Sequence, residues 1–472
     1  MSSEEFSEAS GQYDEDGNMN YDIRKNSESN GKFHTDWLNM MYPRLKLARD
    51  LLSNDGAIFI SIDDKEVENL KKICSEIFGE DNFINTFAWR RTDNQPNIGN
   101  VARVKEYIIC FSKNKSKCIF GRLPLTEKAI NEYRYSDENG KFRRKILLDK
   151  TRGRHIYNIT TTSGKILTGP WMIKKEEFER MKNSNAIYWT KGGEEQPYGK
   201  LYLSESKGQI PNDFLGIEYG TNQRASIEVE KLFEKRLFSF PKPVSLIKTF
   251  IKIATNNNDI ILDFFSGSAT TAHAVMQLNA EDVGNRKFIM VQLPEETDEK
   301  SEARKAGYEN ICEIGKERIR RAGKKIKEEN PNVADKLDTG FRVLKLDSSN
   351  MKDVYYNPSD YNQDMIEALE SNIKDDRSNE DLLFQVMLDL GELLSSDIKE
   401  INIQGKKVFN VGDGNIVACF DEDITNEVLT EIAKMQPFYA IFRDSSLSND
   451  SVVTNFEQIF KTYSPNTITK VL

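Results

Sequence analysis

The chain has 472 residues, of which 38% are hydrophobic and 30% charged, and its formal net charge is −9. This length and polarity indicate a globular protein of several domains, each with its own core. No run of 18 apolar residues occurs, which argues against a membrane-spanning helix. The start, MSSEEFSEASGQYDEDGN, is acidic where a signal peptide is basic and then apolar, so we expect none.

The cysteines bear on the redox compartment. There are five, scattered without a CxxC pair, and the three histidines lie far apart in the sequence. This distribution argues against a disulfide framework, a zinc site or a histidine-based metal centre. We therefore expect no bound metal and a reducing, cytoplasmic location.

The charge is unevenly distributed along the chain. Residues 86–200 contain 24 Lys and Arg against 12 Asp and Glu, whereas residues 331–472 contain 13 against 25. A basic segment within an acidic chain is typical of a surface that contacts the phosphate backbone of nucleic acid. A solvated surface of uneven charge would give the same counts, and charge alone does not separate the two.

The first part of the chain begins with a polar arm and continues as an α/β unit. Residues 1–32 show no hydrophobic periodicity, which predicts a flexible arm. Apolar residues then recur at helical spacing over 37–52, and the turn SNDG at 53–56 ends that helix. The apolar run at 57–62 predicts a buried strand, and a helix follows at 65–78. We expect these elements to belong to a parallel sheet.

Residues 86–235 have a different character, with strand-like pieces at 106–111 and 118–120 among Gly and Pro. Aromatic residues such as Trp171 are interleaved with cations, a mixture that suits nucleic acid because cations contact phosphate and rings stack on bases. We predict DNA contacts from Trp89, Arg90, Arg91, Arg143, Arg144, Lys145, Arg152 and Arg154. An irregular α+β insert with ordinary core aromatics is the alternative.

The α/β pattern returns after this region. Buried strands are predicted at 259–265 and 287–293, and helices at 270–278 and 311–327. The chain then becomes acidic and alternates strands with helices, which predicts a separate small α/β domain at 331–472. Its strands are expected at 408–411, 416–420 and 438–442, and its helices at 381–390 and 426–435.

The sharpest motif lies where the strand at 259–265 meets the next helix. It consists of Asp263, Phe264, Phe265, Ser266, Gly267, Ser268, Ala269 and Thr270. A tight turn of small residues lets backbone N–H groups and the N-terminus of a helix approach a ligand closely. A sharp turn that binds nothing is the alternative, because small-residue turns are common in sheets of this kind.

This turn resembles the glycine-rich cofactor motif of amino-methyltransferases, Asp-x-Phe-x-Gly-x-Gly-Thr-Thr. One helix upstream, the stretch from Phe238 through Phe240, Pro241, Lys242 and Pro243 resembles their Phe-x-x-Pro-Lys-Pro element. In those enzymes the element packs over the methionine end of S-adenosylmethionine. Two such elements in this order and spacing form a specific signal.

Six further segments are similar to the methylation (Mod) subunit of type III restriction–modification systems. They are WLNMMYPRL (37–45), IFISIDD (58–64), VQLPE (291–295), IGKERIRR (314–321), DLLFQV (381–386) and FRD (442–444). The resemblance extends over nearly the whole chain from about residue 33.

The resemblance implies a β-class N6-adenine DNA methyltransferase, which uses S-adenosylmethionine and flips the target adenine out of the duplex. It implies an α/β, Rossmann-like methyltransferase sheet built from residues 33–85 and 236–330. The target recognition domain would be inserted at 86–235, and the C-terminal α/β domain at 331–472 would make subunit contacts. The implied partners are double-stranded DNA, a restriction (Res) subunit and a second Mod copy.

Two positions depart from the family pattern around the cofactor. Ala269 stands in place of the last glycine of the turn, so its Cβ would crowd the ligand, or strain the backbone if that position needs a positive φ. After the next strand, where these enzymes often carry an acid for the ribose hydroxyls, the chain has Gln292, and Glu295 lies three residues on. We favour Glu295 as the ribose ligand.

The family's base-holding motif, Asp-Pro-Pro-Tyr, is absent, because the chain has 13 prolines and no two are adjacent. In the family this motif accepts the hydrogens of the adenine amine and stacks on the base. It lies upstream of the segment that begins here at Phe33, so we expect a chain that starts downstream of it. We also expect a sheet with a gap or an exposed edge, no activity of the chain by itself, and no catalytic residue within it.

Two other functions are considered. The chain could be a non-catalytic module that binds DNA or pairs with an intact Mod subunit. It could instead be an unrelated nucleotide-binding enzyme such as a dehydrogenase, which the Pro-Lys-Pro element ahead of the turn disfavours.

Overall fold

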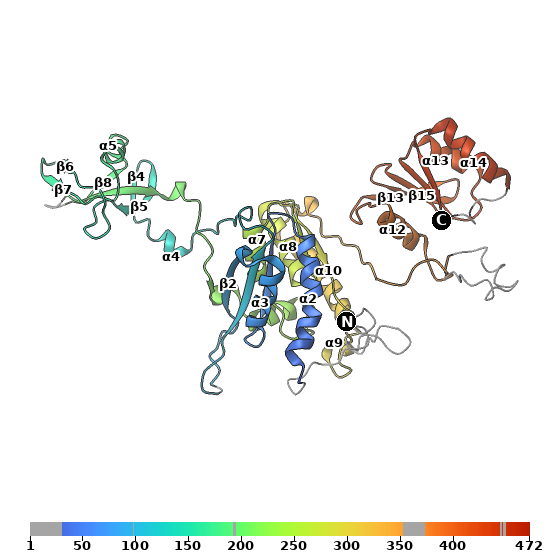
Figure 1. The fold of residues 1–472 in the computed structure, drawn as a ribbon, viewed down its shortest axis with the longest axis horizontal. Helices are drawn as coiled ribbons and strands as arrows, with labels where there is room; N and C mark the ends of the chain where they lie inside the picture. The colour runs from blue at the N-terminus through green and yellow to red at the C-terminus, as the bar shows by residue number, and fades with distance from the viewer. Residues whose placement is uncertain (1–30, 98, 192–194, 353–372, 444–445, 447–449) are drawn as a thin grey trace. The chain divides into compact units, whose positions relative to one another are not determined.

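The computed structural model divides the chain into two compact units, residues 1–341 and 342–472 (Figure 1). It describes residues 31–97, 99–191, 195–352, 373–443, 446 and 450–472. The flexible arm predicted at 1–32 therefore lies almost wholly outside the described residues. No helix in the described part of the chain is long and apolar enough to cross a membrane.

The first sheet of the N-terminal unit has the strand order β1–β3–β2–β10. Its strands are β1 (Ala57–Ile62), β3 (Lys105–Ser112), β2 (Phe83–Arg90) and β10 (Phe214–Leu215). β3 runs antiparallel to both β1 and β2, and β10 runs parallel to β2. β1 and β2 thus point the same way, as expected for an α/β unit, but β3 lies between them. The predicted parallel sheet is mixed here because the chain folds straight back from β2 into β3.

Two helices cover one face of this sheet, α2 (Phe33–Leu51) and α3 (Val67–Phe78). Leu45 of α2 and Leu70 of α3 are fully buried, and they share a core with Ile109 and Phe111 of β3. The apolar stripe of each helix faces the sheet, which is why helical spacing in the sequence predicted both.

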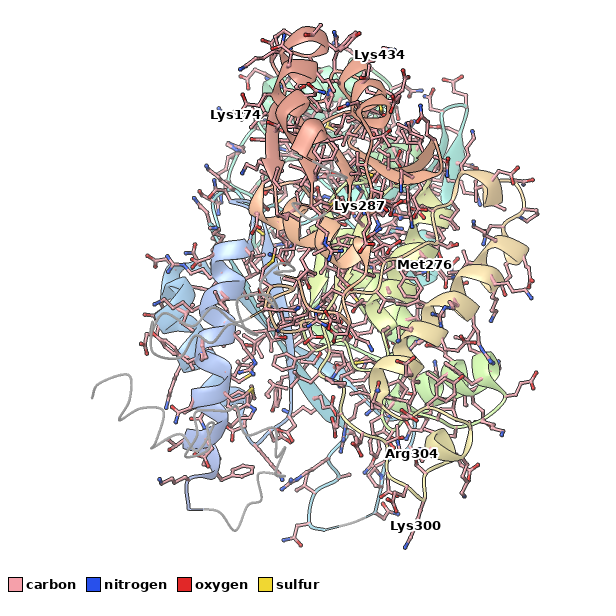
Figure 2. The ribbon with its side chains drawn as sticks, turned by 90° about the vertical axis from the view of Figure 1, so that its right-hand side faces the viewer. Lys174, Met276, Lys287, Lys300, Arg304 and Lys434 are labelled. Atoms are coloured by element: carbon pink, nitrogen blue, oxygen red, sulfur yellow. The ribbon has the colours of Figure 1, made fainter. Side chains whose placement is uncertain are left out.

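The helix α7 connects the first sheet to a second one. Phe250 and Ile253 of α7 pack against the first sheet, whereas Ile251 packs against α8 and the second sheet. Met276 of α8, labelled in Figure 2, is 1% exposed in the core shared by α8 and α10. The elements are α6 (Asn222–Phe233), α7 (Val244–Ala254), β11 (Ile260–Asp263), α8 (Thr270–Asp282), β12 (Lys287–Met290), α9 (Glu302–Lys305) and α10 (Ile311–Glu329).

The second sheet is the parallel pair β11–β12, and both sheets have an edge without a neighbour. Within the described ranges, β1 pairs only with β3, and β11 pairs only with β12. Every open sheet has such edges, so the strand expected to be missing stays a prediction. On one face of the pair, Ile260 is 61% and Ile289 51% exposed, so apolar side chains there contact solvent.

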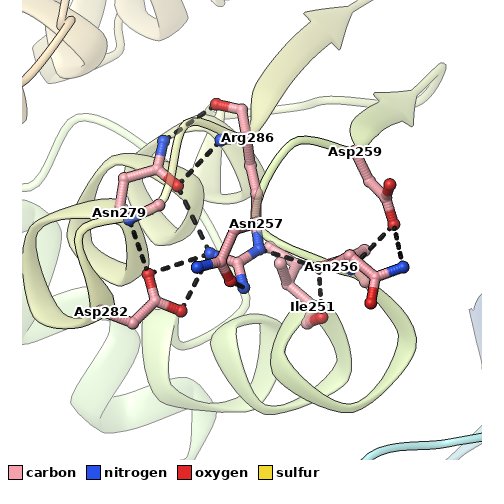
Figure 3. A network of polar contacts seen from close by, with 9 residues as sticks. Ile251, Asn256, Asn257, Asp259, Asn279, Asp282 and Arg286 are labelled. Atoms are coloured by element: carbon pink, nitrogen blue, oxygen red, sulfur yellow. Dashed lines mark hydrogen bonds and ion pairs between the residues drawn. The ribbon is translucent and has the colours of Figure 1, made fainter.

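A polar network fixes the end of the second sheet where β11 and β12 begin (Figure 3). Arg286 is 6% exposed and donates to Asn257 at 3.1 Å and to Asp282 at 3.0 Å. The side chain of Asn279 bonds both the N–H and the carbonyl of Arg286. A buried cation with this many partners holds the strand starts in place. The carboxyl ends of the strands, where ligands bind in such sheets, lie at the opposite edge.

The insert is smaller than the predicted 86–235. Its two connecting segments meet at a bridge between Leu123 and Gln209, so we define the insert as residues 123–209. The flanking residues form β2, β3, β10 and α6 of the main body, because their aromatic side chains pack into its core. The elements of the insert are α4 (Glu127–Ile130), β4 (Tyr135–Asp137), β5 (Gly140–Ile146), β6 (Asn158–Thr160), β7 (Ile166–Thr168), α5 (Lys175–Asn183), β8 (Ile187–Trp189) and β9 (Pro197–Tyr202). The strand expected at 118–120 does not form; these residues follow a turn at 115–117 and belong to no strand.

The C-terminal unit is a five-stranded sheet in the order β13–β14–β15–β16–β17. Helices α13 and α14 pack on one face and α12 on the other. The elements are α12 (Asn379–Asp389), β13 (Ile398–Ile403), β14 (Lys406–Val411), β15 (Ile416–Cys419), α13 (Asn426–Lys434), β16 (Tyr439–Phe442), α14 (Asp450–Tyr463) and β17 (Ile468–Val471). The predicted strands and helices all occur. The unit starts at residue 342 rather than 331 because Leu337 packs with Ile326 in the first unit.

Candidate cofactor site and nucleic-acid surface

The turn between β11 and α8 has a left-handed backbone at two positions. Gly267 has a φ of 50° and Ala269 a φ of 58°. For an L-residue this conformation costs about 1–2 kcal/mol. Ala269 is 2% exposed and shares the core of Ala272 and Ile319 between α8 and α10. The methyl group therefore strains the backbone, as the sequence suggested, but it lies in the core.

Hydrogen bonds inside the protein hold the turn. The N–H of Gly267 donates to the side-chain oxygen of Gln292 at 2.7 Å. The N–H of Ser266 donates to Val291 at 3.2 Å, and that of Ala269 to the carbonyl of Ser266 at 2.8 Å. These three N–H groups are therefore already paired within the protein.

A buried arginine braces the turn from the helix α10. Arg318 is 0% exposed, and its Nη1 donates to the hydroxyls of Ser268 and Thr270, both at 2.7 Å. Its Nε and Nη2 have no hydrogen-bond partner in the described part of the chain. Burial lowers the pKa of the Arg318 guanidinium to about 10, and the charge of Glu228 opposes that shift. The cation is held where it can orient the two hydroxyls of the turn.

Glu228 of α6 extends this buried polar group to the Pro-Lys-Pro element. Its Oε2 accepts the N–H of Val244, the first residue of α7, at 3.1 Å. Burial raises the pKa of the Glu228 carboxyl, and Arg318 acts in the opposite direction. His273 of α8 is 8% exposed, and burial followed by the charge of Arg318 lowers its pKa to about 3. The sequence patterns did not identify Arg318, Glu228 or His273 as site residues, because each lies in an ordinary helical pattern.

The two elements of the predicted cofactor site come together. The Cζ of Phe238 lies 3.4 Å from the position that a Cβ on Gly267 would occupy, so its ring lies against the turn. Phe240 has a φ of 54° and is 71% exposed, whereas Pro241 and Pro243 are buried. The half-buried ring of Phe238 at the turn and the exposed ring of Phe240 two residues on leave apolar surface for a ligand.

The side chain of Lys242 contacts the first sheet. Its ammonium group pairs with Glu106 of β3 and lies 4.8 Å from the ring centre of Trp89. Lys242 therefore anchors the element to the sheet. Among the described residues, no hydrogen bond or ion pair joins its side chain to the turn.

The two candidate ribose ligands differ in their surroundings. The side-chain amide of Gln292 accepts the N–H of Gly267 and donates to the carbonyl of Leu293. Glu295 is exposed, and no side-chain partner is found for it in the described residues. Glu295 is therefore the one with a free carboxylate, whereas Gln292 helps to shape the turn.

The predicted DNA contacts divide into buried and exposed groups. Trp89 is 0% exposed and its Nε1 donates to the carbonyl of Gly220 at 2.9 Å, so the ring belongs to the core and its prediction as a DNA contact is wrong. Arg90 bonds the carbonyls of the loop after β2, and Arg91 pairs with Glu106 at 3.3 Å. Composition alone could not show this, because buried and exposed tryptophans look the same in sequence.

The cations of the insert also divide. Arg143 pairs with Glu132 at 2.8 Å and Arg152 with Asp149 at 2.7 Å. The exposed side chains of Arg144, Lys145 and Arg154 form no ion pair within the described ranges. Trp171 is 0% exposed and forms the core of the insert.

A shallow hollow of about 440 Å³ lies where the insert joins the main body. Arg122, Lys207 and Lys252 are among its lining residues, and none of the residues of the cofactor turn is. It is thus separate from the turn and carries a positive charge.

Comparisons with known proteins agree with this geometry. A family model described as DNA methylase matches residues 15–320. The chain is 38% identical over 322 residues to the Mod subunit of the type III restriction–modification enzyme StyLTI of Salmonella typhimurium, covering 66% of this chain and 49% of that protein. It is 32% identical over 355 residues to the EcoPI Mod subunit of Escherichia phage P1, covering 66% and 53%. It is also 29% identical over 309 residues to the type II methyltransferase M.KpnI of Klebsiella pneumoniae, covering 60% and 72%. The chain spans about half the length of the two Mod subunits.

Proposed function

The chain belongs to the DNA methylase family, and we propose that it is a type III modification subunit that transfers a methyl group from S-adenosylmethionine to the N6 of adenine in double-stranded DNA. The observation that carries the proposal is the approach of Phe238 to Gly267, which joins the two elements of the cofactor site. The relatives named as Mod subunits support the type III assignment.

The residues around the turn fit S-adenosylmethionine. The cofactor supplies an electrophilic methyl group on a sulfonium centre. Gly267 and Ser268 would border it at the turn, the rings of Phe238 and Phe240 would cover its methionine end, and Glu295 would accept hydrogen bonds from the ribose hydroxyls. A free carboxylate suits two hydroxyl donors because it has only acceptor atoms.

The base-holding step needs chemistry that these 472 residues do not carry. The adenine amine is a poor nucleophile, and the resemblance assigns its activation to Asp-Pro-Pro-Tyr, which is absent from the chain. We propose that cofactor and DNA binding reside in this chain, and that methyl transfer requires a segment with that motif.

Two measurements test the proposal. Calorimetry with S-adenosylmethionine is expected to show one site per chain, with no binding of NAD. A transfer assay with tritiated cofactor and adenine-containing duplex DNA is expected to show no product with the chain by itself, and product once a polypeptide carrying Asp-Pro-Pro-Tyr is added or fused.

The outcomes separate the alternatives. No cofactor binding would overturn the proposal, and turnover by the chain alone would overturn the need for the motif. Binding of cofactor and DNA without transfer, even after the motif is supplied, would favour the non-catalytic module.

We further propose that the partners are a restriction (Res) subunit and a second copy of the chain, met through the C-terminal unit, in the cytoplasm. The five cysteines are free, which suits a reducing compartment. In the C-terminal unit, Leu388 is 63% and Leu393 69% exposed, as expected of an interface. Light scattering after gel filtration should give a dimer mass, and a monomer mass for Leu388→Asp with Leu393→Asp. A monomer before mutation would contradict the self-association.

A further inference from the structure

The sheet of the insert has one covered face and one open face. Its strand order is β4–β5–β9–β8. Ile187 of β8 and Leu147, just after β5, belong to the core with Trp171 and Phe178, and this core covers one face. Successive side chains of a strand point to opposite faces, so the neighbours of these residues form the other face.

Aromatic rings lie side by side on the open face. Phe142 is 1% exposed and lies opposite Tyr135 in β4 and Tyr202 in β9. The ring centres of Tyr135 and Tyr188 are 4.9 Å apart, and those of Phe142 and Tyr202 are 5.7 Å apart. The core cluster of Trp171 and Phe178 includes none of these rings.

Arg144 lies over these aromatic rings, two residues from Phe142 along β5. Its guanidinium carbon is 5.0 Å from the ring centre of Tyr135 and 4.6 Å from that of Tyr198. The side chain is exposed and makes no ion pair with any residue that the structure describes. Stacking on two rings restricts an arginine while leaving its N–H fork open, so less freedom is lost when an anion binds.

Two neighbouring cations of the sheet, Lys200 and Arg143, are already paired with carboxylates. Lys200, opposite Arg144 in β9, pairs with Asp137 at 2.7 Å and its side chain is 7% exposed. Arg143 alternates to the other face and pairs with Glu132 at 2.8 Å. Arg144 is thus the cation on the open face that lacks a counter-charge within the described residues.

The insert as a whole favours an anionic partner. Residues 123–209 contain 17 Lys and Arg against 11 Asp and Glu, in a chain with a net charge of −9. We propose that the open face of the β4–β5–β9–β8 sheet is the side of the insert that meets duplex DNA, with Arg144 bound to a backbone phosphate. This inference rests on the proposed function, which makes DNA the substrate. Phosphate rather than a base edge is the contact because charge is what the face supplies.

The test is fluorescence anisotropy of a labelled 30-base-pair duplex of mixed sequence with the full chain, over a series of NaCl concentrations. Arg144→Ala is compared with Arg143→Ala, which removes the same charge from the adjacent residue on the opposite face. One lost phosphate contact reduces the slope of log K against log salt by about 0.9. We expect that reduction and a five- to tenfold weaker Kd at low salt for Arg144→Ala, and less than a twofold change for Arg143→Ala.

A further variant and a fold control exclude simple disruption of the sheet. Arg144→Lys keeps the charge, so its salt slope should match the wild type while its affinity falls two- to threefold. Near-ultraviolet circular dichroism should show the same aromatic signal in all variants. Equal effects of Arg144→Ala and Arg143→Ala would overturn the open-face assignment, and weaker binding with an unchanged slope would overturn the phosphate contact. If the wild type binds no duplex at low salt, the DNA part of the proposed function fails and this inference with it.

Discussion

Arg318 and Arg144 place the same side chain in opposite settings. Arg318 is 0% exposed behind the cofactor turn, where it donates to Ser268 and Thr270. Arg144 is exposed on the insert, stacked on Tyr135 and Tyr198. The guanidinium of Arg318 donates to protein hydroxyls and holds the cofactor turn. The guanidinium of Arg144 keeps its N–H donors free for a ligand.

The difference teaches how polar residues divide between the two regions. Around the cofactor turn, the buried Arg318 and the half-buried Glu228 donate to or accept from other parts of the protein, so their loss should disturb geometry and stability. In the insert, exposed cations without an ion pair, such as Arg144, are proposed to act on an external partner, so their loss should change binding and leave the fold unchanged. The following predictions, from the largest effect to the smallest, test this division.

Arg318→Met is expected to have the largest effect. It removes the bonds to the hydroxyls of Ser268 and Thr270 but retains an apolar side chain of similar length. Hydrogen bonds to charged groups contribute about 1.5–3 kcal/mol each, but the variant also removes a buried charge with two unpaired nitrogens, which offsets part of that loss. The free energy of unfolding should therefore fall by about 2 kcal/mol. The Kd for S-adenosylmethionine, measured by calorimetry well below the melting temperature, should rise at least tenfold.

Two variants separate positioning from general destabilisation in this case. Arg318→Lys should recover part of the affinity, because one donor still reaches the turn. Arg320→Met, on the same helix with a side chain that is 57% exposed, should change Kd less than twofold. Wild-type affinity in Arg318→Met would show that the turn does not need the brace.

His273 should make the cofactor half sensitive to acid. Burial lowers its pKa from 6.5 to about 3, so the folded protein holds the neutral ring. The stabilisation is complete above pH 6.5 and is lost as the pH falls toward 3, at about 1.4 kcal/mol per pH unit. Calorimetric melting at pH 7 and pH 5 should show a loss of about 2 kcal/mol from this group.

The variant His273→Gln has no ring to protonate, so its melting temperature should fall less between pH 7 and pH 5 than that of the wild type. Carboxylates titrate in both proteins and cancel in the difference. Identical pH dependence of the two would refute the role of His273. The C-terminal unit contains no histidine and serves as an internal control.

Glu295 and Gln292 should separate cofactor contact from turn shape. Glu295→Gln removes a free carboxylate, so the Kd for S-adenosylmethionine should rise three- to tenfold with the melting temperature unchanged. Gln292→Leu removes the acceptor of the Gly267 N–H, so it should lower the free energy of unfolding by about 1 kcal/mol as well. A pure stability effect of Glu295→Gln would rule out the ribose contact.

Ala269→Gly should have the smallest effect. Relief of the left-handed backbone favours glycine by about 1 kcal/mol. Loss of a buried methyl group costs about 0.8 kcal/mol, and the more flexible unfolded chain costs about 0.4–1 kcal/mol. The terms nearly cancel, so urea unfolding should shift by less than about 1 kcal/mol. A gain of 2 kcal/mol or more would mean that the strain at Ala269 is larger than its φ of 58° suggests.

Much of the fold could be read from local patterns. The strand, small-residue turn and helix around Asp263 to Thr270 were predicted because their spacing and residue sizes act over a few neighbours. The same holds for the strands and helices of the C-terminal unit. The edges of the insert were misplaced because β2 and β3 share its aromatic and basic composition, yet β3 pairs with β1 and β2 with β3 in the first sheet.

The sequence by itself determined where the cofactor turn lies and which family motifs flank it, since these depend on residues close together in the chain. Only the tertiary structure decided that Arg318 reaches Ser268 from 50 residues away, and that Trp89 is buried against Gly220. It also decided that Arg143 and Arg144 serve opposite faces of one sheet. Contacts between distant segments are set by packing and strand pairing, which no local pattern of residues records.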